Sequence, residues 1–175
     1  MRRVWCTVLI ALALAPSTPA QVPAPFISDA HTVALWHFNE PGGILVRDTS
    51  LFANHGSAVG TSVQPARFGY ARFFDGMSDY VYIDDPANGS LDFRTDQSFT
   101  VDVWFRTSDN LGWLIRKGLA PTPGYAIAIK DGYVQAEIGN REDSRYPDTL
   151  VRIRSQQRFN DAVGMRCVDT SRKSS

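Results

Sequence analysis

The chain contains little of what usually marks a disulfide scaffold or a polyanion-binding protein. Its 175 residues include only two cysteines, Cys6 and Cys167. Because Cys6 lies in the N-terminal segment, a chain that loses this segment has no pair for an internal disulfide. Basic and acidic residues number 18 each, so the net charge is zero. Such a balance gives no field to hold a nucleic-acid backbone or an acidic membrane, and we expect neither as a partner.

Motifs for catalysis are also missing. The histidines, His31, His37 and His55, lie outside any HExxH, GxSxG or CxxC context. A retaining glycosidase needs two carboxylates about 5 Å apart on one face. Glu137 lies in a predicted strand, but its neighbour on the same strand face is Gln135 rather than an acid. We therefore expect no catalytic residues and no enzymatic activity.

Hydrophobic runs are short, and the most distinct one is near the N-terminus. Arg2 and Arg3 precede an apolar stretch at 4–14, which gives way to the small residues Thr18 and Ala20. This is the layout of a secretory signal peptide, and the stretch is well short of the roughly 20 residues that cross a bilayer. We expect residues 1–20 to be cleaved before Gln21 and the chain to be secreted, or periplasmic in a bacterium. A retained membrane anchor is the alternative.

The rest of the chain favours one all-β domain. Residues 21–30 are predicted to be a Pro-rich spacer and residues 31–161 a domain of short strands separated by Gly, Asn, Asp and Pro. Asp131 and Gly132 separate two alternating apolar runs, which is the strongest short-range signal for a hairpin. The strands are predicted at Val33–Phe38, Ala71–Phe74, Tyr80–Asp84, Phe99–Thr107, Trp113–Lys117, Tyr125–Lys130, Tyr133–Ile138 and Leu150–Arg154.

Large aromatic residues and two glycines support the same architecture. Many short antiparallel strands argue for two sheets that bury their apolar sides against each other. Gly56 and Gly76 are expected where the chain turns sharply beside a sheet and a Cβ has no room. The aromatic residues expected to fill the space between the sheets, with sugar stacking as the alternative role, are Trp36, Phe38, Phe73, Tyr80 and Trp104.

Several motifs, in order along the chain, resemble the laminin-G-like and concanavalin-A-like jelly-roll family. VALWHFNE at 33–40, DTS at 48–50 and NHG at 54–56 are similar to its opening. FFDG at 73–76, YVYI at 80–83 and SFTVDVWF at 98–105 are similar to its later strands. The resemblance covers residues 33 to 161 and implies an antiparallel two-sheet jelly-roll sandwich. After Asp161 the pattern stops, so we expect an incomplete sandwich and a disordered, non-family tail at 162–175.

Oxygen-bearing side chains gather in the predicted turns, at Asp48, Ser50, Asn54 and Asp75. Calcium takes six to eight oxygen ligands. The family resemblance implies that this edge holds calcium, with Asp48, Asn54 and Asp75 as the metal ligands. The alternative is that Asp48 and Asn54 only form hydrogen bonds with the backbone of their own turns.

Taken together, these features predict a secreted, non-catalytic binding module. Its ligand is expected to be a carbohydrate or an extracellular protein, bound at loops on one rim with calcium as the implied cofactor. Two alternatives stay open. One is a fragment of a glycan-active hydrolase or lyase of the same superfamily, and the other is a structural or adhesive domain of a larger surface protein.

Overall fold

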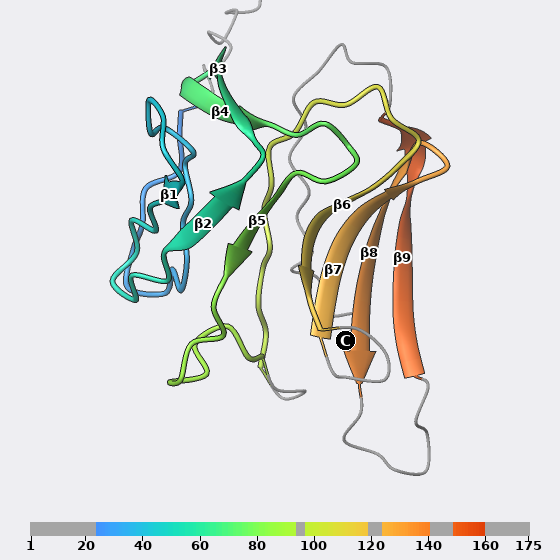
Figure 1. Cartoon of the computed structure of the whole chain (residues 1–175). Helices are drawn as coiled ribbons and strands as arrows, with labels where there is room; N and C mark the ends of the chain where they lie inside the picture. Colours follow the sequence, from blue (N-terminus) through green and yellow to red (C-terminus); the bar gives the residue numbers. More distant parts are fainter. Residues whose placement is uncertain (1–23, 94–96, 119–123, 141–148, 160–175) are drawn as a thin grey trace, which may run out of the picture.

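The protein is all-β, with antiparallel sheets, as the sequence predicts. The computed structural model describes residues 24–93, 97–118, 124–140 and 149–159, and within these ranges it contains strands but no helix (Figure 1). The signal peptide expected at 1–20 and the tail expected at 162–175 lie outside the described residues. In the part of the chain that is described, no helix is long and apolar enough to cross a membrane.

Two small sheets come from the N-terminal half. Strands β1 (Leu45–Val46), β2 (Gly56–Val59) and β5 (Tyr80–Ile83) pair in that order, and β3 (Ser62–Ala66) pairs with β4 (Gly69–Phe73). Val46 and Ala58 are buried on the inner side of the first sheet. Gly56 opens β2, where a Cβ would stand 3.0 Å from the carbonyl oxygen of Tyr82 on β5. The expected lack of room for a Cβ at Gly56 is therefore confirmed, whereas the expected sharp turn is wrong, because Gly56 lies within strand β2.

The C-terminal half forms one four-stranded sheet whose strands are neighbours in chain order. It consists of β6 (Leu111–Lys117), β7 (Gly124–Lys130), β8 (Tyr133–Asn140) and β9 (Thr149–Arg158), on the right in Figure 1. The turn between β7 and β8 has positive φ at both central residues, 53° at Asp131 and 81° at Gly132. That is the type I′ geometry that Asp-Gly favours, so the predicted hairpin is confirmed.

The pairing register gives this sheet two chemically distinct sides. Directly paired residues of an antiparallel ladder point to the same side. The apolar face contains Ile127, Ala136 and Ile153. Ile127 pairs with Ala136, and Ala136 pairs with Ile153. The opposite side, called the polar face below, contains Trp113, Arg116, Ala126, Ala128, Tyr133, Gln135, Glu137, Arg152 and Arg154.

The core lies on the apolar face and involves the segment 99–107. Ile127, Ile129 and Val134 are buried there, and Val101, Val103 and Phe105 pack against them. The predicted alternation of side chains in this segment is thus correct, but the predicted strand Phe99–Thr107 is wrong. The segment is drawn as a yellow trace without a strand in Figure 1. Alternation reports which side chains are buried, not whether the backbone joins a ladder.

The predicted strand Val33–Phe38 is also wrong. Trp36 forms only an isolated bridge to Asp48. Phe38 has φ of 58°, in the left-handed region that a strand does not use. Nearby, the Leu35 amide donates to the Asp48 side chain rather than to a neighbouring strand. A single bridge and side-chain hydrogen bonds to Asp48 therefore replace the expected ladder.

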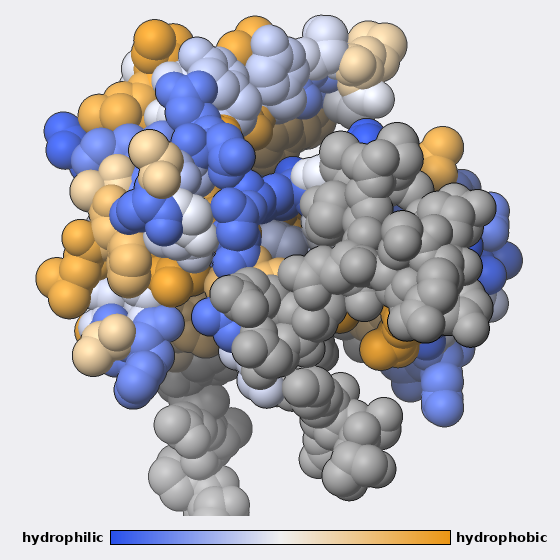
Figure 2. Space-filling view, turned by 90° about the horizontal axis from the view of Figure 1, so that it is seen from below, coloured by the Kyte–Doolittle hydropathy of each residue, from blue (hydrophilic) through white to orange (hydrophobic). Residues whose placement is uncertain are grey.

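Some of the predicted core aromatics lie at the surface. Phe73 and Tyr80 are 51% and 52% exposed, so core packing is wrong for these two, whereas Trp36, Phe38 and Trp104 are half-buried. Strand alternation explains the error, because Tyr80 and Tyr82 occupy the outer side of β5. Hydrophobic residues reach the surface in several places among hydrophilic ones (Figure 2).

Candidate functional site

The Asp48 side chain lies buried at the centre of the turn between β1 and β2. It is 5% exposed. Its Oδ1 accepts hydrogen bonds from the backbone amides of Leu35 and Ser50, both at 2.8 Å. Its Oδ2 accepts from the Ser50 hydroxyl at 2.7 Å and from the Asn54 amide at 2.8 Å. A carboxylate has about four lone-pair positions, so these four donors fill the acceptor capacity of Asp48.

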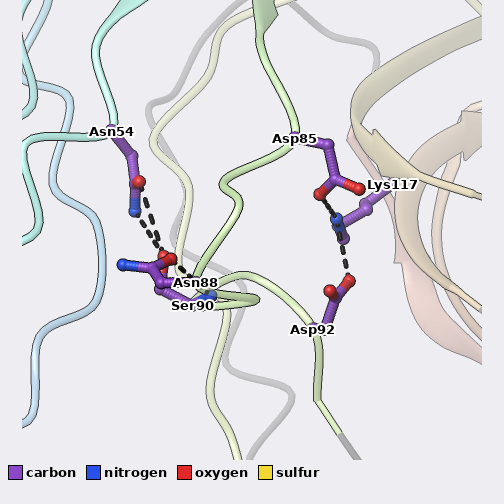
Figure 3. A network of polar contacts seen from close by, with 6 residues as sticks. All are labelled: Asn54, Asp85, Asn88, Ser90, Asp92 and Lys117. Atoms are coloured by element: carbon purple, nitrogen blue, oxygen red, sulfur yellow. Dashed lines mark hydrogen bonds and ion pairs between the residues drawn. The ribbon is translucent and has the colours of Figure 1, made fainter.

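Asn54 completes the same turn and links it to a second loop. Its side-chain amide donates to the Val33 carbonyl at 3.0 Å and to the Ser90 hydroxyl at 3.1 Å. The backbone carbonyl of Asn54 accepts a hydrogen bond from the indole N–H of Trp36 at 2.8 Å. Figure 3 shows the contact between Asn54 and Ser90, with Asn88 beside it. These hydrogen bonds fix the positions of neighbouring backbone segments, and they reach beyond the turn itself to Val33 and Leu35.

Asp75 lies in a different turn, between β4 and β5. Its Oδ1 accepts hydrogen bonds from the amides of Met77, Ser78 and Asp79 at 2.8, 2.9 and 3.1 Å. These backbone hydrogen bonds hold the pKa of the exposed Asp75 carboxyl below its ordinary value. Gly76 in this turn has φ of 74°, as expected for a glycine at a sharp bend.

The three residues implied as calcium ligands therefore divide into two groups. Asp48 and Asn54 share one turn, and the hydrogen bonds of Asp75 stay within the other. Among the described residues, no three His, Cys, Asp or Glu side chains gather as a group that could hold a metal ion.

The polar face combines a buried floor with an exposed rim. Its floor contains the small residues Ala126 and Ala128 and the polar residues Gln135 and Glu137, all buried. At the rim, Trp113 is 53% exposed. The rim cations lie over aromatic rings, with Arg116 5.1 Å from the ring centre of Trp113 and Arg154 4.2 Å from that of Tyr133. A cation placed over a ring in this way is attracted by the negative face of the aromatic ring.

Glu137 is held in place at the centre of that floor. Its Oε1 accepts hydrogen bonds from the Gln135 side-chain amide at 2.5 Å and from Arg152 Nε at 3.1 Å. The residues directly opposite Glu137 on the neighbouring strands are Ala126 and Arg152. Among the described residues, no carboxylate therefore lies directly opposite Glu137 on either neighbouring strand.

This cluster was not found from the sequence. The signal was present as a second alternation, in which Gln135 and Glu137 on β8 match Arg152 and Arg154 on β9. The apolar alternation of the same strands is the stronger pattern, and Glu137 stands in it as an isolated acid. Knowledge of the register is needed to bring Trp113 and Arg152 to the same side of the sheet, because they lie far apart in the chain and three strands apart in space.

A charged contact joins the loop after β5 to the four-stranded sheet. Lys117 at the end of β6 forms ion pairs with Asp85 and with Asp92, the latter at 2.9 Å (Figure 3). Burial lowers the pKa of Lys117, but hydrogen bonds to the two carboxylates outweigh it and raise the pKa. Phe93, from the same loop, stacks on Phe99 at 4.3 Å, and both rings lie 5.4 Å from Tyr125.

Comparisons with known proteins give no relative. Protein-family models, curated protein sequences and solved structures contain no match to this chain.

Proposed function

We propose that the chain is an exported, non-catalytic carbohydrate-binding module of the jelly-roll type, and that its polar face is the binding surface. The main support for this proposal is Trp113, a half-exposed tryptophan. It lies on the same side of the sheet as Gln135 and Glu137, which are buried and hydrogen-bonded to each other. Sugar rings present apolar C–H faces that stack on indole and hydroxyls that pair with fixed polar groups. The half-exposed Trp113 offers the first kind of contact, and the exposed Arg116 and Arg154 at the rim offer hydrogen-bond donors for the second.

The dimensions of the polar face suit an oligosaccharide. Neighbouring strands are about 4.8 Å apart, so Trp113 on β6 and Arg154 on β9 lie roughly 14 Å apart across the sheet. Alanines on β7 keep the middle low, because Ala126 and Ala128 carry only a methyl group. Long side chains on both outer strands then give the surface two walls.

A hydrolase reading of the same face has weaker support. Glycoside hydrolysis uses one carboxyl group as an acid and a second as base or nucleophile. Glu137 is paired across the sheet with Arg152 and Ala126. We therefore assign Glu137 to ligand positioning.

The binding test is a glycan array with the exported chain. We expect Trp113→Ala and Gln135→Ala to weaken binding at least tenfold, which corresponds to about 1.4 kcal/mol. Tyr80→Ala is the matched control, because Tyr80 is equally exposed but lies on the other sheet. Equal losses in all three variants, or no glycan bound at all, would contradict the proposal. Release of reducing sugar that disappears in Glu137→Gln would favour the hydrolase instead.

Calcium assistance is a separate hypothesis with its own test. To bind Asp48, the ion has to displace backbone donors that already occupy both oxygens. A ligand that binds only the folded chain stabilises it by about 2.7 kcal/mol when the ligand concentration is a hundred times Kd. We expect the same Tm in millimolar calcium and in chelator. A rise in Tm with calcium that Asp75→Asn removes would restore the calcium site.

A further inference from the structure

Strand β9 lies at an edge of the four-stranded sheet in the part of the chain that the structure describes. In an antiparallel pair, every second residue directs its N–H and C=O groups away from the neighbour. An edge strand therefore presents a row of groups that another extended segment can pair with. Its regular register with β8 runs from Thr149 to Arg154, before the shift near Ser155.

The two sides of this edge differ in chemistry. Val151 and Ile153 belong to the apolar face and are 59% and 60% exposed. They border a small pocket whose lining includes Phe99, Val101 and Ile138. An apolar side chain placed beside β9 on this side would cover both residues and fill the pocket.

The other side of the edge is basic. Arg152, Arg154 and Arg158 follow one another along the polar side of β9 and are all exposed. Among the described residues, two carboxylates pair with them, Glu137 with Arg152 and Asp131 with Arg154. The described part of this side therefore carries more positive than negative charge, although the whole chain is neutral.

The charge pattern argues against a second copy of the chain at this edge. A two-fold antiparallel pairing of β9 with itself, centred on Ile153, would place Arg152 of each copy directly opposite Arg154 of the other. Like charges directly opposite one another destabilise a ladder. Charged residues on an edge are a common means of preventing self-association.

We propose that β9 is a docking edge for an extended segment of a partner protein that alternates apolar and acidic residues. The segment adds to the sheet as a fifth strand. Its backbone pairs with the outward groups of β9, its apolar side chains cover Val151 and Ile153, and its acidic side chains meet the arginines. This edge shares Arg152 and Arg154 with the polar face, but the inference does not depend on carbohydrate binding there.

The test uses a fluorescent, blocked peptide of alternating glutamate and valine, about six residues long, the length of a typical strand. We expect it to bind the exported chain at least tenfold more tightly than a lysine–valine peptide or a peptide with the glutamates and valines in separate blocks. N-methylation of alternate residues, in the phase that removes the pairing N–H groups, should abolish binding. Added salt should weaken it, because the arginines are exposed.

Variants of the chain locate the peptide. Arg154→Glu and Ile153→Asn should each lower its affinity at least tenfold. Arg116→Glu is the matched control, since Arg116 lies on the same sheet side but at the opposite edge, on β6. Hydrogen exchange should slow at alternate β9 amides when the peptide binds. Equal binding of alternating and block peptides, equal effects of Arg154→Glu and Arg116→Glu, or dimerisation of the chain through β9 would each overturn the proposal.

Discussion

At the scale of single residues, Asp48 connects the segment around Leu35 to the turn that precedes β2. Replacement by asparagine removes the charge and turns one acceptor into a donor that faces other donors. Hydrogen bonds to a buried charged group contribute about 1.5–3 kcal/mol. We predict that Asp48→Asn lowers the free energy of unfolding by about 3 kcal/mol in urea denaturation. Asp84→Asn, at an exposed position, is the control and should change it little.

Asp75 gives a pH-dependent prediction. Its pKa in the folded chain is lowered by the backbone hydrogen bonds of its turn, so the charged form stabilises the fold above the unfolded pKa of about 4. This contribution is lost as pH falls through the lower folded value. We predict that Asp75→Asn is less stable than the wild type at pH 7 and that the two Tm values converge in acid. A constant difference across pH would show that the carboxylate charge has no role in the turn.

Residue chemistry was only partly readable from the sequence. The oxygen-rich character of Asp48 and Asn54 was visible in the sequence, but the hydrogen-bond donors around Asp48 were not. They include the backbone amide of Leu35, from thirteen residues earlier. A distant amide of this kind leaves no local pattern in the sequence.

At the scale of elements, the Asp131–Gly132 turn sets the register of the β7–β8 hairpin. A Cβ at φ of 81° is strained, and the left-handed conformation costs an ordinary residue about 1–2 kcal/mol. We predict that Gly132→Ala destabilises the chain by about that amount in chemical denaturation. Gly112→Ala is the matched control, because a Cβ at Gly112 meets no atom within 4 Å. Similar losses in both variants would mean that the added methyl group destabilises the chain irrespective of the turn geometry.

Strand prediction succeeded where apolar alternation and turn residues agreed, as in β6 to β9. It missed β1, β2 and β3 for physical reasons. β1 has only two residues, and β3 contains Pro65. β2 has the sequence Gly-Ser-Ala-Val, whose side chains are too small to show an alternation of apolar and polar residues. Proline lacks the N–H of a ladder, so it argues against a strand unless the strand lies at an edge. β3 pairs only with β4 among the described strands.

At the scale of the whole molecule, Lys117 connects the loop after β5 to the four-stranded sheet. Its partners Asp85 and Asp92 are largely exposed, so screening limits the energy of the network to about 1 kcal/mol. We predict that Lys117→Met lowers the unfolding free energy by about this amount and increases proteolysis within residues 84–92. Lys130→Met is the control at an exposed position. Unchanged proteolysis would mean that the aromatic stack of Phe93 and Phe99 alone holds the loop.

The consecutive order of β6, β7, β8 and β9 has a consequence for how the chain folds. Each of these strands pairs with its neighbour in sequence, whereas β2 must find β5 across the intervening β3–β4 hairpin. Loop closure costs less entropy for near contacts, and folding rates rise as contacts become more local. The C-terminal meander is then the region expected to form in the transition state, with φ-values well above those of β1 and β2. Substitutions such as Ile127→Val should slow folding, and Ala58→Gly should mainly accelerate unfolding.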